Sequence, residues 1–327
     1  MNPRNLLCRA AMVPCAVMLA AVATVGSAQS YPQRAVRLVL AYPPGGGSDT
    51  LARIVSPKLG ENLGQQVVVE NRPGAGANLG AEIAARSAPD GYTLFMGNEA
   101  HTINASLYGK LSYDLVKDFS PVTMLADTPN IVVVHPSVPA KSIKELIALA
   151  KARPGELNQA SAGSGSSSHL AGELFKSQAR IKMLHIPYKG GGPAVVNLVA
   201  GEASVGFATM PSVLPMIKAG RLRGLAVTTS RRSRAAAELP TVAESGLPDY
   251  EASTWYCLLV PMGVSRDIIT RVHTEMIKVL GLPEVKERLA SYGYEIITST
   301  PEQLAAQIKS EIVKWAKVVK EAGMRVD

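Results

Sequence analysis

The stretch Tyr42–Asp49, which reads Tyr-Pro-Pro-Gly-Gly-Gly-Ser-Asp, constrains the fold of this chain more than any other. The apolar run Val36–Ala41 precedes it, and a helical pattern begins near Thr50. A strand that enters a helix through a glycine turn points backbone N–H groups and a helix N-terminus at one place, and such a place binds anions. The turn holds no lysine, so we expect it to hold a carboxylate by dipoles rather than by a salt bridge.

The same order of strand, turn and helix recurs along the chain. Repeated alternation predicts an α/β fold with parallel strands flanked by helices. Ser142 with Glu145, and Thr300 with Gln303, form capping boxes that predict two helix starts. The expected strands are Val36–Ala41, Gln66–Glu70, Thr93–Gly97, Asn158–Ser161, Lys182–Ile186, Ala203–Thr209 and Leu222–Thr228.

Two stretches are typical of connections between lobes. One is the apolar segment Val122–His135, and the other runs from Val227 through a polar stretch to Val260. If both cross, residues 133–227 form one lobe, and residues 29–132 with 228–327 form the other. Two crossings make a hinge, so the pattern predicts two α/β lobes with a ligand cleft between them.

The N-terminus has the pattern of a secretory signal peptide over residues 1–28. Arg4 and Arg9 precede the uncharged run Ala10–Val25, and small residues end at Ala28. The alternative is a membrane anchor, which the short run and its proline disfavour. Export leaves Cys257 as the one cysteine. An exported chain without a disulfide fits a bacterial periplasm.

The overall composition excludes several function classes. The formal net charge is +8, but the basic residues are scattered and aromatic residues make up only 5%, so nucleic-acid binding is not expected. The five histidines have no metal-ligand spacing. We therefore expect neither a metal nor a cofactor. The turn Glu70–Gly80 is similar to a dinucleotide fingerprint, but Leu79 takes the third glycine position, which favours a simple tight turn.

A serine-rich loop, Ser161–His169, again joins a strand to a helix. It allows three interpretations: a flexible linker, a secreted serine hydrolase that uses Ser164–Ser168 with His169, or a second anion cradle. The loop lacks a Gly-x-Ser-x-Gly elbow, which disfavours the hydrolase. A third glycine turn, Tyr188–Pro193, carries Lys189, which either contacts an anion or is a surface lysine. Several such turns without a nucleophile, base or metal describe a binding cleft and not an enzyme.

The residues resemble a known family, the substrate-binding proteins of tripartite tricarboxylate transporters, or Bug family of periplasmic receptors. The resemblance implies a type II-like periplasmic-binding fold, which closes on a small carboxylate ligand such as a di- or tricarboxylate, an acidic amino acid or an aromatic acid. It also implies possible delivery to two integral-membrane permease subunits, and we expect a monomer. A ligand-sensing subunit of a signalling system is the remaining alternative. The matching stretches are Tyr42–Asp49, Glu70–Gly80, Ala88–Thr93, Tyr188–Pro193, Leu239–Gly246 and Trp255–Pro261.

The same resemblance implies which residues face the ligand, and none of them is catalytic. Asp49 is expected to be the N-cap of the helix that follows the first turn. The expected ligand-binding residues are Pro44, Gly46, Gly47, Ser48, Asn98, His101, Thr102, Ser164, Ser166, Ser167, Ser168, His169, Tyr188, Gly190, Gly191 and Thr209.

Overall fold

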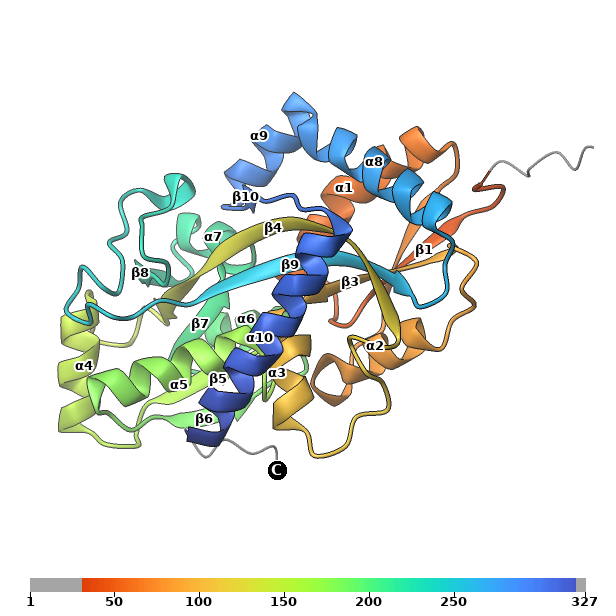
Figure 1. Cartoon of the computed structure of the whole chain (residues 1–327). Helices are drawn as coiled ribbons and strands as arrows, with labels where there is room; N and C mark the ends of the chain where they lie inside the picture. The colour runs from red at the N-terminus through yellow and green to blue at the C-terminus, as the bar shows by residue number, and fades with distance from the viewer. Residues whose placement is uncertain (1–30, 322–327) are drawn as a thin grey trace, which may run out of the picture. The chain divides into compact units, whose positions relative to one another are not determined.

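Figure 1 shows the computed structural model of the protein, which describes residues 31–321. The expected signal peptide, residues 1–28, lies outside the described residues. Strands and helices alternate along most of the described chain, which confirms the α/β fold expected from the sequence. Between residues 31 and 321, no helix is both long enough and apolar enough to cross a bilayer.

Three parallel strands form one end of the sheet. β1 (Val36–Leu40) lies between β2 (Val67–Asn71) and β3 (Thr93–Asn98) and pairs with both in parallel. Every residue of β3 is buried, as expected for a parallel strand that is covered on both faces. The expected strands at these three places are confirmed to within about a residue. The helices that follow are α1 (Gly47–Leu63), a 3₁₀ turn η1 (Ala75–Ala77) leading into α2 (Asn78–Ala85), and α3 (Glu99–Leu107).

The long strand β4 (Phe119–Val134) connects this part of the sheet with the next (Figure 1). Its first part pairs antiparallel with β9 (Ser253–Pro261), which also pairs with β3. Its last residues pair antiparallel with β7 (Val205–Thr209) and β8 (Arg223–Val227). All but the last residue of the segment that the sequence marked as a crossing, Val122–His135, is therefore part of one continuous strand.

The second part of the sheet is again parallel. β5 (Asn158–Ser161) lies between β7 and β6 (Leu184–Pro187) and runs parallel to both. Successive β4 residues point to opposite faces, so Val132 joins the core with Phe175 and Phe207, while Val133 joins the core with Leu198. The helices that cover these strands are α4 (Ile143–Ala152), α5 (Ser167–Ala179), α6 (Gly191–Ala200) and α7 (Met210–Lys218).

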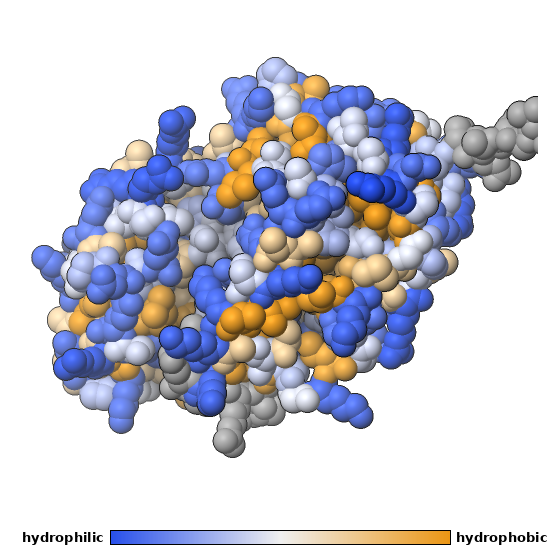
Figure 2. Space-filling view, in the orientation of Figure 1, coloured by the Kyte–Doolittle hydropathy of each residue, from blue (hydrophilic) through white to orange (hydrophobic). Residues whose placement is uncertain are grey.

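The C-terminal elements pack back on the first part of the sheet. They are the 3₁₀ turn η2 (Arg234–Ala236), α8 (Arg266–Gly281), α9 (Pro283–Ser291), the short strand β10 (Glu295–Ile296) and α10 (Pro301–Glu321). Thr300 and Gln303 exchange hydrogen bonds of 2.9 and 3.2 Å, which confirms the expected capping box. α10 packs against α3 and β4. Its Leu304 and Ile308 are buried while Val313 is 72% exposed, and Figure 2 shows hydrophobic patches among the hydrophilic residues of this face.

Thr228, just after β8, ties the returning chain to β4. Its Oγ1 accepts the Asn130 N–H at 2.9 Å and lies 2.6 Å from the carbonyl oxygen of Ala252. Its backbone N–H also donates to the Asn130 carbonyl at 3.0 Å. Because Thr228 and Asn130 are fully buried, water cannot replace these bonds. This residue therefore joins three segments at the place where the chain passes between the two parts of the sheet.

We expect Thr228→Val, which keeps the shape and removes the hydroxyl, to lower the free energy of unfolding by about 1–3 kcal/mol, because the Asn130 N–H loses its acceptor. Urea unfolding followed by circular dichroism measures this loss. The neighbouring Thr229→Val is the control, because the Thr229 hydroxyl bonds an exposed carbonyl, that of Arg231. Equal stability of the two variants would contradict the role assigned to Thr228.

Candidate functional site

Five helices begin where five strands end. α1, α3, α5, α6 and α7 each follow a strand, namely β1, β3, β5, β6 and β7. The N-terminal end of a helix carries unpaired N–H groups and partial positive charge, and ligands of α/β sheets bind beyond the carboxyl ends of the strands. Four of the N-caps, and the residue after the fifth, line one cavity. The five N-caps are Gly46, Asn98, Ser166, Gly190 and Thr209.

The cavity is small, about 40 Å³, which is room for a few water molecules. Eight of the sixteen residues expected to face a ligand line it: Gly46, Gly47, Ser48, Asn98, Ser166, Ser167, Gly191 and Thr209. Four further residues that were not among the expected ligand-binding residues complete the wall: Tyr42, Ala162, Thr254 and Tyr256. The cavity thus draws on both parts of the sheet.

The first glycine turn makes one wall. A Cβ atom on Gly46 would have the carbonyl oxygen of Pro43, 4.0 Å away, as its nearest neighbour, so a side chain there would extend into free space. Gly47 has no such room, because its Cβ would lie 2.2 Å from the Tyr256 hydroxyl. The absence of a side chain at Gly46 therefore leaves free space beside the backbone N–H groups that open α1, whereas at Gly47 it makes room for the Tyr256 hydroxyl.

Asp49 does not have the role that the sequence predicted. α1 begins at Gly47 with Gly46 as its N-cap, so Asp49 is the third helical residue and the N-cap prediction was wrong. The carboxylate instead accepts bonds from Gly45 N–H at 3.1 Å, Asn71 Nδ2 at 3.1 Å and Arg53 Nε at 3.0 Å. Burial opposes its ionisation, yet these bonds hold the pKa of Asp49 below its ordinary value. Asp49 therefore holds the first glycine turn in shape through these three bonds.

The end of β3 supplies the next wall. Asn98 donates from Nδ2 to the Tyr42 hydroxyl at 3.3 Å, and its backbone N–H is accepted by Nδ1 of His101 at 3.1 Å. Burial lowers the pKa of His101 to about 4, which keeps the ring neutral and able to accept this bond. Thr102 donates to the Glu99 carbonyl at 2.7 Å. His101 and Thr102 therefore shape the start of α3 from outside the cavity lining.

The serine-rich loop makes the wall from the other part of the sheet. The Ser166 hydroxyl donates to the Gly163 carbonyl at 2.6 Å, and Ser168 Oγ accepts the Ala162 N–H at 2.8 Å. His169 accepts the Gly165 N–H at Nδ1, 3.2 Å away, and its Nε2 lies 3.4 Å from Glu173. These contacts hold the loop in shape. Ser164, Ser168 and His169 lie outside the cavity lining, whereas Ser166 and Ser167 belong to it.

The third glycine turn lies directly against the first. A Cβ on Gly190 would lie 2.3 Å from Pro43 Cδ, and one on Gly192 would lie 2.4 Å from the Pro44 carbonyl oxygen. The two turns touch only because these glycines have no side chains. Tyr188 packs behind the turn, where its N–H bonds the Ser161 carbonyl at 3.0 Å. Pro44, Tyr188 and Gly190 lie outside the lining.

The missed residues Thr254 and Tyr256 come from β9, a strand distant in sequence from all three turns. They are two positions apart, so both side chains point to the same face of the strand. Tyr256 also contacts Thr209 across the cavity. Their sequence neighbourhood, Trp255–Pro261, matched the family pattern, but only the pairing of β9 with β3 and β4 brings it to the site.

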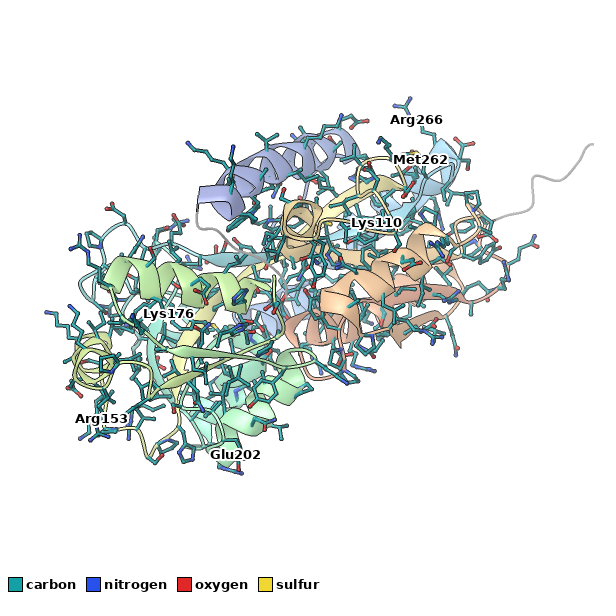
Figure 3. The ribbon with its side chains drawn as sticks, turned by 90° about the horizontal axis from the view of Figure 1, so that it is seen from below. Lys110, Arg153, Lys176, Glu202, Met262 and Arg266 are labelled. Carbon is teal, nitrogen blue, oxygen red and sulfur yellow. The ribbon has the colours of Figure 1, made fainter. Side chains whose placement is uncertain are left out.

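The cavity lining contains no lysine, arginine, aspartate or glutamate. Charged residues such as Arg153, Glu202 and Arg266 lie at the outer edges of the view in Figure 3 and are exposed. Lys189 is likewise exposed. Within residues 31–321, no group of three histidine, cysteine, aspartate or glutamate side chains is placed to hold a metal. Helix N-termini are therefore the source of positive potential on the cavity walls.

Glu99, the first residue of α3, is a buried carboxyl group next to these walls. It is 3% exposed, and its Oε2 accepts the Trp255 N–H at 3.1 Å. Burial raises the pKa of Glu99 to about 8, more than the bonds from its neighbours lower it. The group is therefore largely neutral at pH 7.

Comparison with known proteins identifies the family. The sequence profile of the tripartite tricarboxylate transporter family receptor matches residues 51–324. The chain belongs to this family. Protein BugT of Bordetella pertussis is 38% identical to it over the full length of both chains. This confirms the resemblance found in the sequence motifs, and members of this receptor family bind solutes.

Solved structures of family members share the fold. The R. palustris protein Rpa4515 with adipate superposes with a TM-score of 0.88 at 35% identity, covering 90% of this chain and 99% of that one. MatC from Rhodopseudomonas palustris with bound malate gives a TM-score of 0.84 at 30% identity, covering 88% and 100%. The periplasmic binding protein BugD gives 0.87 at 30% identity, covering 90% and 99%. The two-lobed periplasmic-binding fold is thus confirmed.

We expect Gly192→Ala to push the two turns apart, because its Cβ overlaps the Pro44 carbonyl oxygen at 2.4 Å. Such overlap costs about 1–3 kcal/mol, enough to shift an open–closed equilibrium by roughly 5- to 150-fold. Small-angle X-ray scattering should show a larger radius of gyration. Gly281→Ala is the control, because nothing lies within 4 Å of its Cβ. Identical scattering from both variants would contradict the role of this contact.

We expect Glu99→Gln to stabilise the protein increasingly as pH rises from about 5 to 8. The folded protein binds the Glu99 proton more tightly than the unfolded chain, whose carboxyl has a pKa near 4.5. The wild type therefore loses stability as pH rises through this range, by up to about 1.4 kcal/mol per pH unit. Urea unfolding of both proteins at pH 5, 6, 7 and 8 measures the difference. A difference that does not change with pH would contradict a neutral, buried Glu99.

Proposed function

We propose that the protein is a periplasmic receptor that captures a small organic carboxylate between its lobes and delivers it to a tripartite tricarboxylate-type transporter. The observation that carries this proposal is the meeting of five helix N-termini at one cavity without a charged side chain in its lining. Backbone N–H groups and helix dipoles bind a carboxylate without leaving a cation buried and unpaired when the site is empty.

A dicarboxylate matches this two-sided arrangement best, and the lobes would have to move apart to admit it, because a cavity of about 40 Å³ holds only a few water molecules. α1 and α3 follow strands of the first part of the sheet, and α5, α6 and α7 follow strands of the second. One carboxylate at each set of helix starts would bridge the two lobes and favour the closed state by its differential affinity. The adipate and malate of the two Rhodopseudomonas structures support this ligand class. The lobe bounds, residues 29–132 with 228–327 and residues 133–227, stay predictions.

The location and the partners of the receptor follow from the same reasoning. We expect export to the periplasm through the signal peptide of residues 1–28, and delivery to two integral-membrane permease subunits. A monomer that binds no nucleic acid is expected. A sensory role with the same ligand would use the same cavity, and gene neighbours that encode two permease subunits would favour transport.

The serine hydrolase alternative has less support. Hydrolysis needs a serine hydroxyl that is bonded to a base. The hydroxyl of Ser166 instead donates to the Gly163 carbonyl, and that of Ser168 lies 2.9 Å from Ser166 Oγ. The His169 ring takes the Gly165 N–H and faces Glu173. These groups are arranged to hold a loop, and we propose that the protein is not an enzyme.

We expect isothermal calorimetry to show binding of a dicarboxylate in a panel of adipate, malate, hexanoate, simple amines and sugars. Gly46→Val should weaken that binding by roughly 100-fold, because the new side chain would occupy the free space beside the α1 N-terminus. Gly46 has φ −88° and ψ 174°, which valine adopts readily, so the thermal midpoint should change little.

Gly109→Val is the matched control, because nothing lies within 4 Å of the Cβ position of Gly109. It should bind like the wild type. Binding of amines or sugars with no carboxylate bound would overturn the proposed function. Unchanged affinity in Gly46→Val would instead remove only the first glycine turn from the site.

A further inference from the structure

Glu99 stands immediately behind the cavity wall. Its carboxyl group lies near the hydroxyls of Ser167 and Thr254, both of which line the cavity. Glu99 Oε1 and Thr254 Oγ1 are both buried and lack a hydrogen-bond partner. This carboxyl oxygen and this hydroxyl lie close together at the cavity and lack partners. A bound molecule would complete their hydrogen bonding.

None of the groups that shift the pKa of Glu99 is a cationic side chain. Tyr42, from the first turn, and Tyr256 and Cys257, from β9, surround it, and burial raises the pKa of each. His101, on the same helix, is kept neutral by burial. His169, on α5, faces Glu173. Contacts with Ser167, Thr254, the Trp255 N–H and the start of α3 favour the ionised form, and burial outweighs them.

We propose that Glu99 sets the hydrogen-bond polarity of the cavity wall, and this rests on the proposed function. A neutral Glu99 donates its O–H to one of the two hydroxyl oxygens, which leaves the Ser167 and Thr254 hydrogens free to point at an anionic ligand. An ionised Glu99 accepts both hydroxyl hydrogens, so the wall presents oxygen lone pairs that repel a carboxylate. Glu99 is a positioning residue that selects for anions through its proton.

This arrangement couples ligand binding to one proton. An anion in the cavity favours the neutral form of Glu99. Binding at a pH above the pKa of Glu99 in the ligand-free protein, about 8, therefore requires uptake of a proton. Affinity for a carboxylate should be nearly constant from pH 6 to 7 and should fall up to tenfold per pH unit above about pH 8. A ligand that carried a cation to this wall would show the opposite slope.

The test is calorimetric titration with adipate, or with malate if adipate does not bind, between pH 6 and 9.5. The wild type should lose affinity above pH 8 and take up close to one proton per ligand, measured in buffers of different ionisation enthalpy. Glu99→Gln, whose amide N–H replaces the acid O–H as donor, should bind with a pH-independent affinity. Glu275→Gln is the control: Glu275 is 4% exposed on α8, paired with Arg271 and Lys278, and its removal should leave the wild-type pH profile.

A flat wild-type profile, or an equal fall in Glu99→Gln, would overturn the role of Glu99 while the proposed function stands. If neither adipate nor malate binds at any pH, the dicarboxylate function fails, and the pKa of Glu99 is measured in the ligand-free protein. Its carboxyl carbon is then titrated by NMR, with Glu99→Gln to assign the signal. A midpoint near 8 supports a neutral Glu99 behind the wall, and one near 4.5 overturns it.

Discussion

The contact between two glycine turns is the constraint on which the site depends. Pro43 and Pro44 of the first turn meet Gly190 and Gly192 of the third at distances that leave no room for a Cβ atom. This approach brings helix starts from both parts of the sheet to one cavity of about 40 Å³. If either turn carried side chains, the N-termini of α1 and α6 would be held apart and no small ligand could touch both.

The proposed carboxylate site would use backbone dipoles where many anion sites use arginine or lysine. A buried cation would need a partner whenever the ligand is absent, and desolvating it is costly. Helix N–H groups are fixed by the helix itself and carry only partial charge, so the empty cavity is stable. Glu99, a buried acid beside the cavity, fits this logic because no cation pairs with it and burial raises its pKa. Family members with adipate and malate show that the fold accommodates dicarboxylates.

Much of the site could be predicted from local sequence. Gly46, Gly47 and Ser48 were found because a strand, a glycine turn and a helix start follow one another directly in the chain. The N-cap role was assigned wrongly to Asp49, because sequence alone does not show that the helix begins at Gly47, two residues before Asp49. His101 and His169 were expected at the cavity, but both rings bond backbone N–H groups of their own turns. A polar side chain near a helix start either contacts a ligand or bonds the backbone of its own turn, and local sequence does not distinguish the two roles.

The sequence by itself determined the α/β order and the three glycine- and serine-rich turns, because these properties depend on neighbouring residues. Only the tertiary structure decided which turns touch, since that depends on β4 passing through both parts of the sheet. It also placed Thr254 and Tyr256 in the cavity wall and buried Glu99 behind it. Strand pairing between residues more than 150 positions apart sets those positions, and no local pattern records it.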